Sequence, residues 1–170
     1  MNRTRSSPTL VSLALALPLL AGCANPDKIP PGQSEAEVLQ KHGRPLAEVP
    51  IPGGKRLQYV NPPFSQTGYM VDLDANGRVL RAEQVMSDAH FGRVRIGQDT
   101  MATVQRDFGP PSKVAYYHAS GRNPVWNYKY LQSGTFPMLM GVYFDEKGTV
   151  SRLETGPDPD YDRGGNDRAK

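Results

Sequence analysis

Short runs rich in β-branched and aromatic residues, separated by turn residues, occupy most of the chain after residue 55. Runs of this kind predict β-strands. A first set covers residues 56–60, 69–73 and 79–85, and a second set covers residues 114–118, 125–131, 138–144 and 150–154. Residues 74–77 and 145–148 have the composition of hairpin turns. Each set is therefore expected to form an antiparallel meander.

A short helical pattern precedes each set of strands. Its apolar positions are Ala36, Val38 and Leu39 in the first segment and Met101, Val104 and Phe108 in the second. Ser34, with Glu37 three residues later, predicts a capping box at the start of the first helix. Asp99 or Thr100 is expected to cap the second helix.

Each helical segment runs into a glycine that is followed by proline. Gly43 precedes Pro45, and Gly109 precedes Pro110 and Pro111. A glycine just past a helix commonly takes a left-handed conformation, and proline beyond it cannot extend the helix. We therefore expect Gly43 and Gly109 to be structural helix stops in the left-handed conformation.

The two helix-and-strand sets match each other in sequence, which indicates an internal duplication. With one inserted residue, residues 32–45 match 97–111, and residues 71–79 match 142–150. The fold class expected is therefore α+β, with two tandem units that are each a short helical segment followed by an antiparallel β-meander. Residues 32–87 form the first unit, residues 88–156 form a linker and the second unit, and residues 157–170 are expected to be a disordered tail.

The N-terminal residues have the three parts of a secretory signal peptide. Arg3 and Arg5 precede a short apolar run, which ends in Leu20, Ala21, Gly22 and Cys23. The run is too short to span a bilayer, which takes about 20 residues. The order Leu-Ala-Gly-Cys resembles the bacterial lipobox, in which the cysteine receives the lipid, including palmitate. This resemblance implies a signal peptide over residues 1–22, lipid attachment at Cys23, and a spacer that ends at residue 31.

The residue after the cysteine indicates a cellular location, and the composition limits the classes of partner. Ala24, rather than aspartate, follows the cysteine, and by resemblance to bacterial lipoproteins this implies the periplasmic face of the outer membrane. Removal of Arg3 and Arg5 with the leader brings the formal charge of +3 close to neutral, so no nucleic-acid partner is expected. A single cysteine excludes an internal disulfide.

The ordered motifs resemble one known family. Gly32, Val38, Gly43 and Pro45, then a strand with a central Tyr59, then the turn and strand at 74–79, are similar to the SmpA/OmlA (BamE-like) domain. The resemblance covers most of residues 32–86 and 94–155, and a tandem pair of such units resembles the β-lactamase inhibitory protein fold. It implies a protein–protein interaction role in outer-membrane barrel assembly or envelope integrity. The alternative is a periplasmic protein that binds or inhibits a soluble enzyme.

The remaining motifs do not predict a metal site, a catalytic site or an aromatic binding face. Asp72, Asp74, Asn76 and Glu83 fit a calcium-loop pattern, but strands rather than helices flank it, so no metal site is expected. The histidines His42, His90 and His118 have no zinc-ligand spacing. No catalytic motif or cofactor-binding motif is present, so neither catalysis nor a cofactor is expected. The aromatic run Tyr116, Tyr117, Trp126, Tyr128 and Tyr130 is expected to belong mainly to the core rather than to a binding face.

Overall fold

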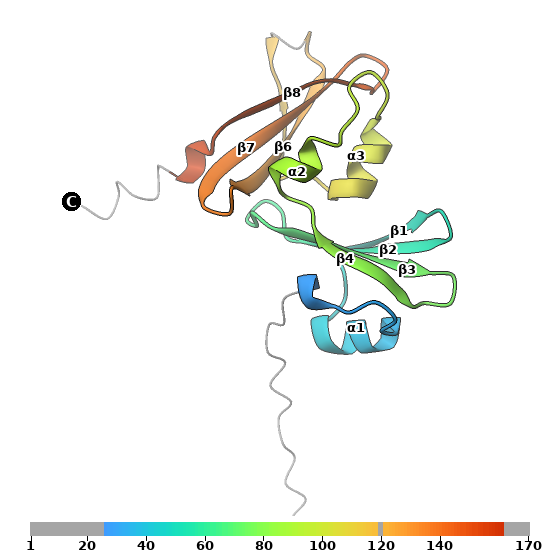
Figure 1. Ribbon diagram of the computed structural model, residues 1–170. Coiled ribbons are helices and arrows are strands. Elements are labelled where there is room, and N and C mark those ends of the chain that lie inside the picture. Colours follow the sequence, from blue (N-terminus) through green and yellow to red (C-terminus); the bar gives the residue numbers. More distant parts are fainter. Residues whose placement is uncertain (1–25, 119–120, 162–170) are drawn as a thin grey trace, which may run out of the picture.

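The computed structural model describes residues 26–118 and 121–161 (Figure 1). Its elements are η1 (Pro26–Lys28), α1 (Glu35–His42), β1 (Ala47–Ile51), β2 (Gly54–Val60), β3 (Gly68–Asp74), β4 (Val79–Gln84), α2 (Asp88–Phe91), α3 (Met101–Phe108), β5 (Lys113–Tyr116), β6 (Pro124–Gln132), β7 (Phe136–Phe144) and β8 (Val150–Pro157). The predicted signal peptide, Cys23 and the first part of the spacer lie outside the described residues.

The fold is mostly antiparallel β, and the predicted α+β class with two helix-then-meander units is wrong. The strands form two four-stranded sheets with the orders β1-β2-β3-β4 and β5-β6-β7-β8. The α-helices are only eight, four and eight residues long. Moreover, α3 lies between the two sheets rather than within a self-contained second unit (Figure 1). Because α3 packs against both sheets, it does not belong to a separate α+β unit.

Two further predictions need correction at the level of single elements. No strand is predicted at residues 47–51, which include Pro50, yet these residues form β1. It is the edge strand of its sheet, and an edge tolerates proline. The predicted disordered tail begins too early. Pro157 is the last residue of β8, and the buried Asp158 lies 3.5 Å from the Lys129 ammonium.

The layers follow one another as α1, first sheet, α2 with α3, and second sheet (Figure 1). A smaller core joins η1 and α1 to the first sheet and contains Ile29, Val38, Leu57, Val71, Leu73 and Val79. A larger core fills the space between the sheets. It combines Met70 from the first sheet and Val85, which follows β4, with Val104 and Phe108 of α3 and Tyr128 of the second sheet.

The segment between the two sets of strands contributes to this larger core instead of serving only as a linker. Its helix α2 places Phe91 between the sheets, where the ring is buried and stacks on Phe108 with centroids 4.7 Å apart. Tyr130 of β6 meets the same ring edge-on at 5.3 Å. The aromatic cluster therefore ties α2, α3 and the second sheet together.

Matching local contacts recur in the two halves of the chain. Ser34 and Thr100 cap α1 and α3 with complete capping boxes. The hydroxyl of Tyr59 donates to the Gly43 carbonyl at 3.0 Å, and the hydroxyl of Tyr128 donates to the Gly109 carbonyl at 3.0 Å. The sequence duplication thus corresponds to repeated local contacts, although the two halves do not form separate units.

Gly43 and Gly109 end their helices in a conformation other than the one predicted. Their φ and ψ angles are 76° and −168° for Gly43 and 77° and −169° for Gly109. Positive φ was expected, but this value of ψ belongs to an extended region that is essentially restricted to glycine, not to the left-handed helical region. Asparagine, which tolerates the left-handed helical region, has no advantage here.

We predict that Gly109→Ala and Gly109→Asn destabilise the protein by similar amounts, on the order of 1–3 kcal/mol. The cost at Gly43 should be smaller, because a Cβ atom at Gly109 would approach Val60 Cγ2 to 3.0 Å, whereas at Gly43 nothing lies within 4 Å. Urea unfolding of Gly109→Ala, Gly109→Asn and the same two substitutions at Gly43 compares alanine with asparagine and one position with the other. Near wild-type stability of Gly109→Asn would contradict the assigned conformation, and equal costs at both positions would contradict the steric difference.

Candidate functional site

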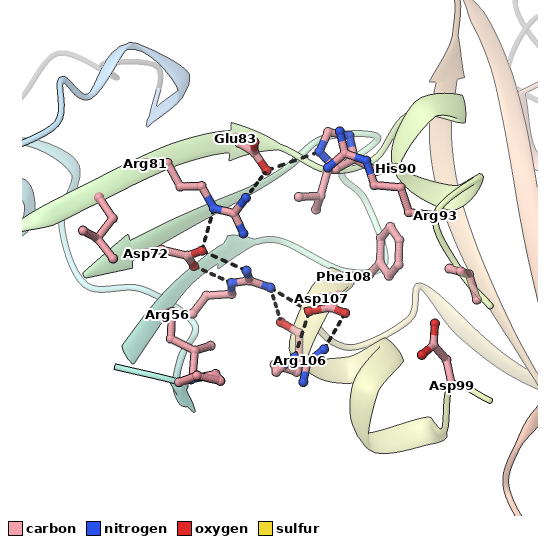
Figure 2. Close-up of a pocket in the computed structure, with 15 residues that line it drawn as sticks. Arg56, Asp72, Arg81, Glu83, His90, Arg93, Asp99, Arg106, Asp107 and Phe108 are labelled. Atoms are coloured by element: carbon pink, nitrogen blue, oxygen red, sulfur yellow. Dashed lines mark hydrogen bonds and ion pairs between the residues drawn. The ribbon is translucent and has the colours of Figure 1, made fainter. Parts of the chain in front are cut away.

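A cleft of about 660 Å³ opens between the first sheet and the α2–α3 segment (Figure 2). Its lining combines four arginines, four carboxylates, one histidine and six apolar residues. The first sheet supplies Arg56 from β2, Asp72 from β3 and Arg81 and Glu83 from β4. The opposite wall includes His90 of α2 and Asp107 of α3. The cleft therefore combines charged and apolar side chains and lies where the two halves of the molecule meet.

Arg56 occupies the floor of the cleft, and its side chain is only 10% exposed. Its Nε and Nη2 donate to the two carboxylate oxygens of Asp72 at 2.6 and 3.0 Å. Its Nη1 donates to Asp107 Oδ1 at 2.8 Å. Arg56 and Asp72 are direct partners across β2 and β3, so the sheet register itself aligns the two-pronged pair.

Asp72 lies between two arginines, because Arg81 is its direct partner on the other neighbouring strand, β4. Arg81 Nε donates to Asp72 Oδ2 at 2.8 Å. Burial alone would raise the pKa of Asp72, but hydrogen bonds from Arg56 and Arg81 and the attraction of both charges outweigh it. The net result is a pKa below the ordinary value for aspartate.

Strand β2, which carries Arg56, also binds the C-terminal end of α3 through side-chain hydrogen bonds. Gln58 Nε2 donates to the carbonyl oxygens of Gln105 and Arg106 at 2.9 and 3.0 Å, and Arg56 Nη1 donates to the Arg106 carbonyl at 3.2 Å. The last carbonyls of a helix have no partner within the helix and carry partial negative charge, which a guanidinium stabilises. Polar side chains of β2 therefore dock α3 onto the first sheet.

A weaker set of contacts lines the upper part of the cleft. Glu83 lies 3.7 Å from Arg81 Nη1 and 3.5 Å from His90 Nε2 (Figure 2). His90 Nδ1 lies 2.8 Å from the hydroxyl of Ser87. The other two histidines are elsewhere. His42 meets the edge of the Tyr59 ring, and the exposed His118 lines a separate shallow pocket of about 260 Å³. The three histidines do not form one site.

The structure gives the predicted calcium-pattern residues other partners. Asp72 is engaged by two arginines, and Asp74 Oδ1 accepts the backbone N–H groups of Asn76 and Arg78, each at 2.8 Å. Asp145 does the same for Lys147 and Thr149 in the second sheet. The aspartate of this turn therefore stabilises a hairpin. Among the described residues, no group of three or more side chains could hold a metal ion.

The aromatic run divides between core and surface. Tyr128 and Tyr130 are buried and Trp126 is half-buried, in agreement with the prediction, but Tyr116 and Tyr117 are exposed. The sequence pattern singled out Asp72, Glu83 and His90 for other reasons, but it did not predict the cleft or its arginines. The available signal was the alternation of Arg56 and Gln58 within a strand, which is typical of a solvent-facing side; only the packing of α3 on that side makes it internal.

Comparison of the chain with protein-family models, curated proteins and solved structures gives no match. The resemblance to the SmpA/OmlA domain therefore stays a prediction. None of the helices in the described part of the chain is both long and apolar enough to cross a membrane.

Asp72→Asn should destabilise the protein by about 3–5 kcal/mol at neutral pH, because it leaves the buried Arg56 without its main counter-charge. The wild-type advantage should also depend on pH. A folded-state pKa below the unfolded value of about 3.9 means that this stabilisation is present above about pH 4 and is lost as the pH falls through the folded pKa.

Urea unfolding of both proteins from about pH 7 down to pH 2.5 tests this, since the difference between them should shrink in acid. Glu48→Gln is a suitable control, because its ion pair with Lys55 is half-exposed and should contribute no more than about 1 kcal/mol. If the free energy of unfolding fell equally steeply with pH in wild type and Asp72→Asn below about pH 4, that would contradict the role assigned to Asp72.

Proposed function

We propose that this chain is a lipoprotein of the outer membrane, held on the periplasmic face through Cys23, that acts as a protein–protein interaction module in the cell envelope. The observation that carries the proposal is the leader, in which two arginines and an apolar run end at Leu20, Ala21, Gly22 and Cys23. One acyl chain binds a membrane only marginally, whereas two or more anchor a protein stably.

The described part of the chain supports an interaction role. Its exposed large apolar side chains are Leu46, Phe64, Leu80, Ile96, Val114, Tyr116, Tyr117, Phe136 and Tyr161. Aromatic residues are enriched at protein interfaces, where they provide contact area with few rotatable bonds. Val114 and Tyr116 lie on β5, an edge strand whose outer side has no neighbour in the sheet. These features support binding to another protein, and outer-membrane barrel assembly or envelope integrity is the setting that we propose.

Cys23→Ala should abolish incorporation of labelled palmitate and release the protein from the membrane fraction, because it removes the only thiol. Ala24→Asp is the matched variant: it should still incorporate the label but shift the protein to the inner membrane. Metabolic labelling followed by separation of the two membranes measures both. Palmitate in the Cys23→Ala protein would contradict the anchor, and outer-membrane retention of Ala24→Asp would contradict the sorting signal.

The partner is tested by crosslinking in intact cells and purification of the tagged chain from solubilised membranes. Components of the barrel-assembly machinery are the expected capture, with Cys23→Ala as the control for localisation. Capture of a single soluble enzyme would support the alternative role of a periplasmic inhibitor instead. Recovery of the same proteins with an unrelated outer-membrane lipoprotein would contradict a specific interaction.

A further inference from the structure

The charged side chains that line the cleft between the first sheet and the α2–α3 segment do not all have ion-pair partners within the part of the chain that the structure describes. Each carboxylate in its lining has a cationic partner: Asp72 pairs with Arg56 and Arg81, Asp107 with Arg56 and Arg106, Glu83 with Arg81, and Asp99 with Arg95. By contrast, the exposed side chain of Arg93 makes neither an ion pair nor a hydrogen bond within the described residues. The charged group of the cleft that is left without a described partner is therefore a cation, which could bind an anion.

Two further arginines add donors at the mouth. Arg81 and Arg106 have side chains that are 53% and 41% exposed. Arg81 uses Nε and Nη1 in its ion pairs, and Arg106 uses Nε and Nη2. One terminal nitrogen of each guanidinium is thus left to bind a ligand, and guanidinium groups match carboxylates in geometry.

Apolar side chains line the cleft beside these arginines. Leu80, whose exposed fraction is 53%, and the β1–β2 residues Ile51 and Pro52 lie on the first-sheet side, and Val94 follows α2 on the other side. An exposed leucine within a cleft gains free energy when a ligand covers it. A free inorganic anion would satisfy the arginines but would leave this apolar wall in water.

We propose that the cleft binds an acidic peptide segment of a partner protein, with a carboxylate at Arg93, further donors available from Arg81 and Arg106, and neighbouring apolar side chains against Leu80 and Ile51. The proposal rests on the interaction role proposed above and names the chemistry of the partner. The lining contains four arginines and four carboxylates, whose formal charges cancel. What the cleft has in excess is hydrogen-bond donors on its guanidinium groups. A singly charged carboxylate fits that balance better than a multiply charged phosphate group.

Fluorescence anisotropy of the full, lipidated chain in mild detergent tests the proposal. The probe is a labelled, end-capped pentapeptide with a central glutamate between leucines, and the matched probe has glutamine in that position. We expect wild type to prefer the glutamate peptide, and Arg93→Gln to weaken its binding roughly tenfold, the loss of one charge-assisted hydrogen bond. Binding of the glutamine peptide should be unchanged by that variant.

Two other variants separate the contributions. Leu80→Ala should weaken both peptides equally, because it removes only apolar contact. Arg44→Gln makes the same charge change at an exposed position outside the cleft and should leave both affinities unchanged. Since Arg93 has no ion pair to lose, an unaltered melting temperature of Arg93→Gln shows that weaker binding does not come from unfolding.

Equal affinity of wild type for the two peptides would overturn the proposal. So would Arg93-dependent binding of soluble short-chain phosphatidylglycerol with no binding of either peptide, because that result identifies a lipid as the ligand. The crosslinking experiment keeps this proposal separate from the interaction role. If Arg93→Gln captured the partner as well as wild type does, only the proposal that the cleft binds the partner would be rejected. If the peptide bound but no partner were captured in cells, the proposed interaction role in the envelope would be rejected.

Discussion

The contact on which the structure depends is that of the Arg56 guanidinium with Asp72 and with the end of α3. Arg56 is held by Asp72 within the first sheet and donates from Nη1 to Asp107 and to the Arg106 carbonyl of α3. Gln58, two residues along the same strand, binds the neighbouring carbonyls. One face of β2 therefore neutralises the negative end of a helix that belongs to the other half of the chain.

A charge buried to this extent is stabilising only when its partners are complete. The sheet register supplies them, because Asp72 pairs directly with Arg56 on one side and with Arg81 on the other. Replacing the whole cluster with apolar residues of similar volume would often be neutral, whereas removing one member leaves a desolvated charge. The cluster thus fixes how α3 sits on the sheet more than it adds to the free energy of folding.

The same cluster gives the cleft its character. Because the carboxylates of the lining are occupied by internal pairing, the arginines at the mouth keep their remaining donors for a ligand. Docking of α3 also brings Leu80 and Val94, which come from opposite walls, to one opening. Structural pairing and the proposed binding of an acidic segment are therefore properties of one arrangement.

The sequence by itself predicted most strands, the capping box of the first helix, the two helix-ending glycines, the hairpin turns and the internal duplication. These depend on contacts between residues close in the chain, such as Ser34 with Glu37, or Asp74 with its own turn. Only the tertiary structure decided the mostly antiparallel β fold, the extended positive-φ conformation of Gly43 and Gly109, and the cleft. The reason is that Arg56 and Asp107 lie 51 residues apart, and alternation along β2 shows a polar face without showing what covers it.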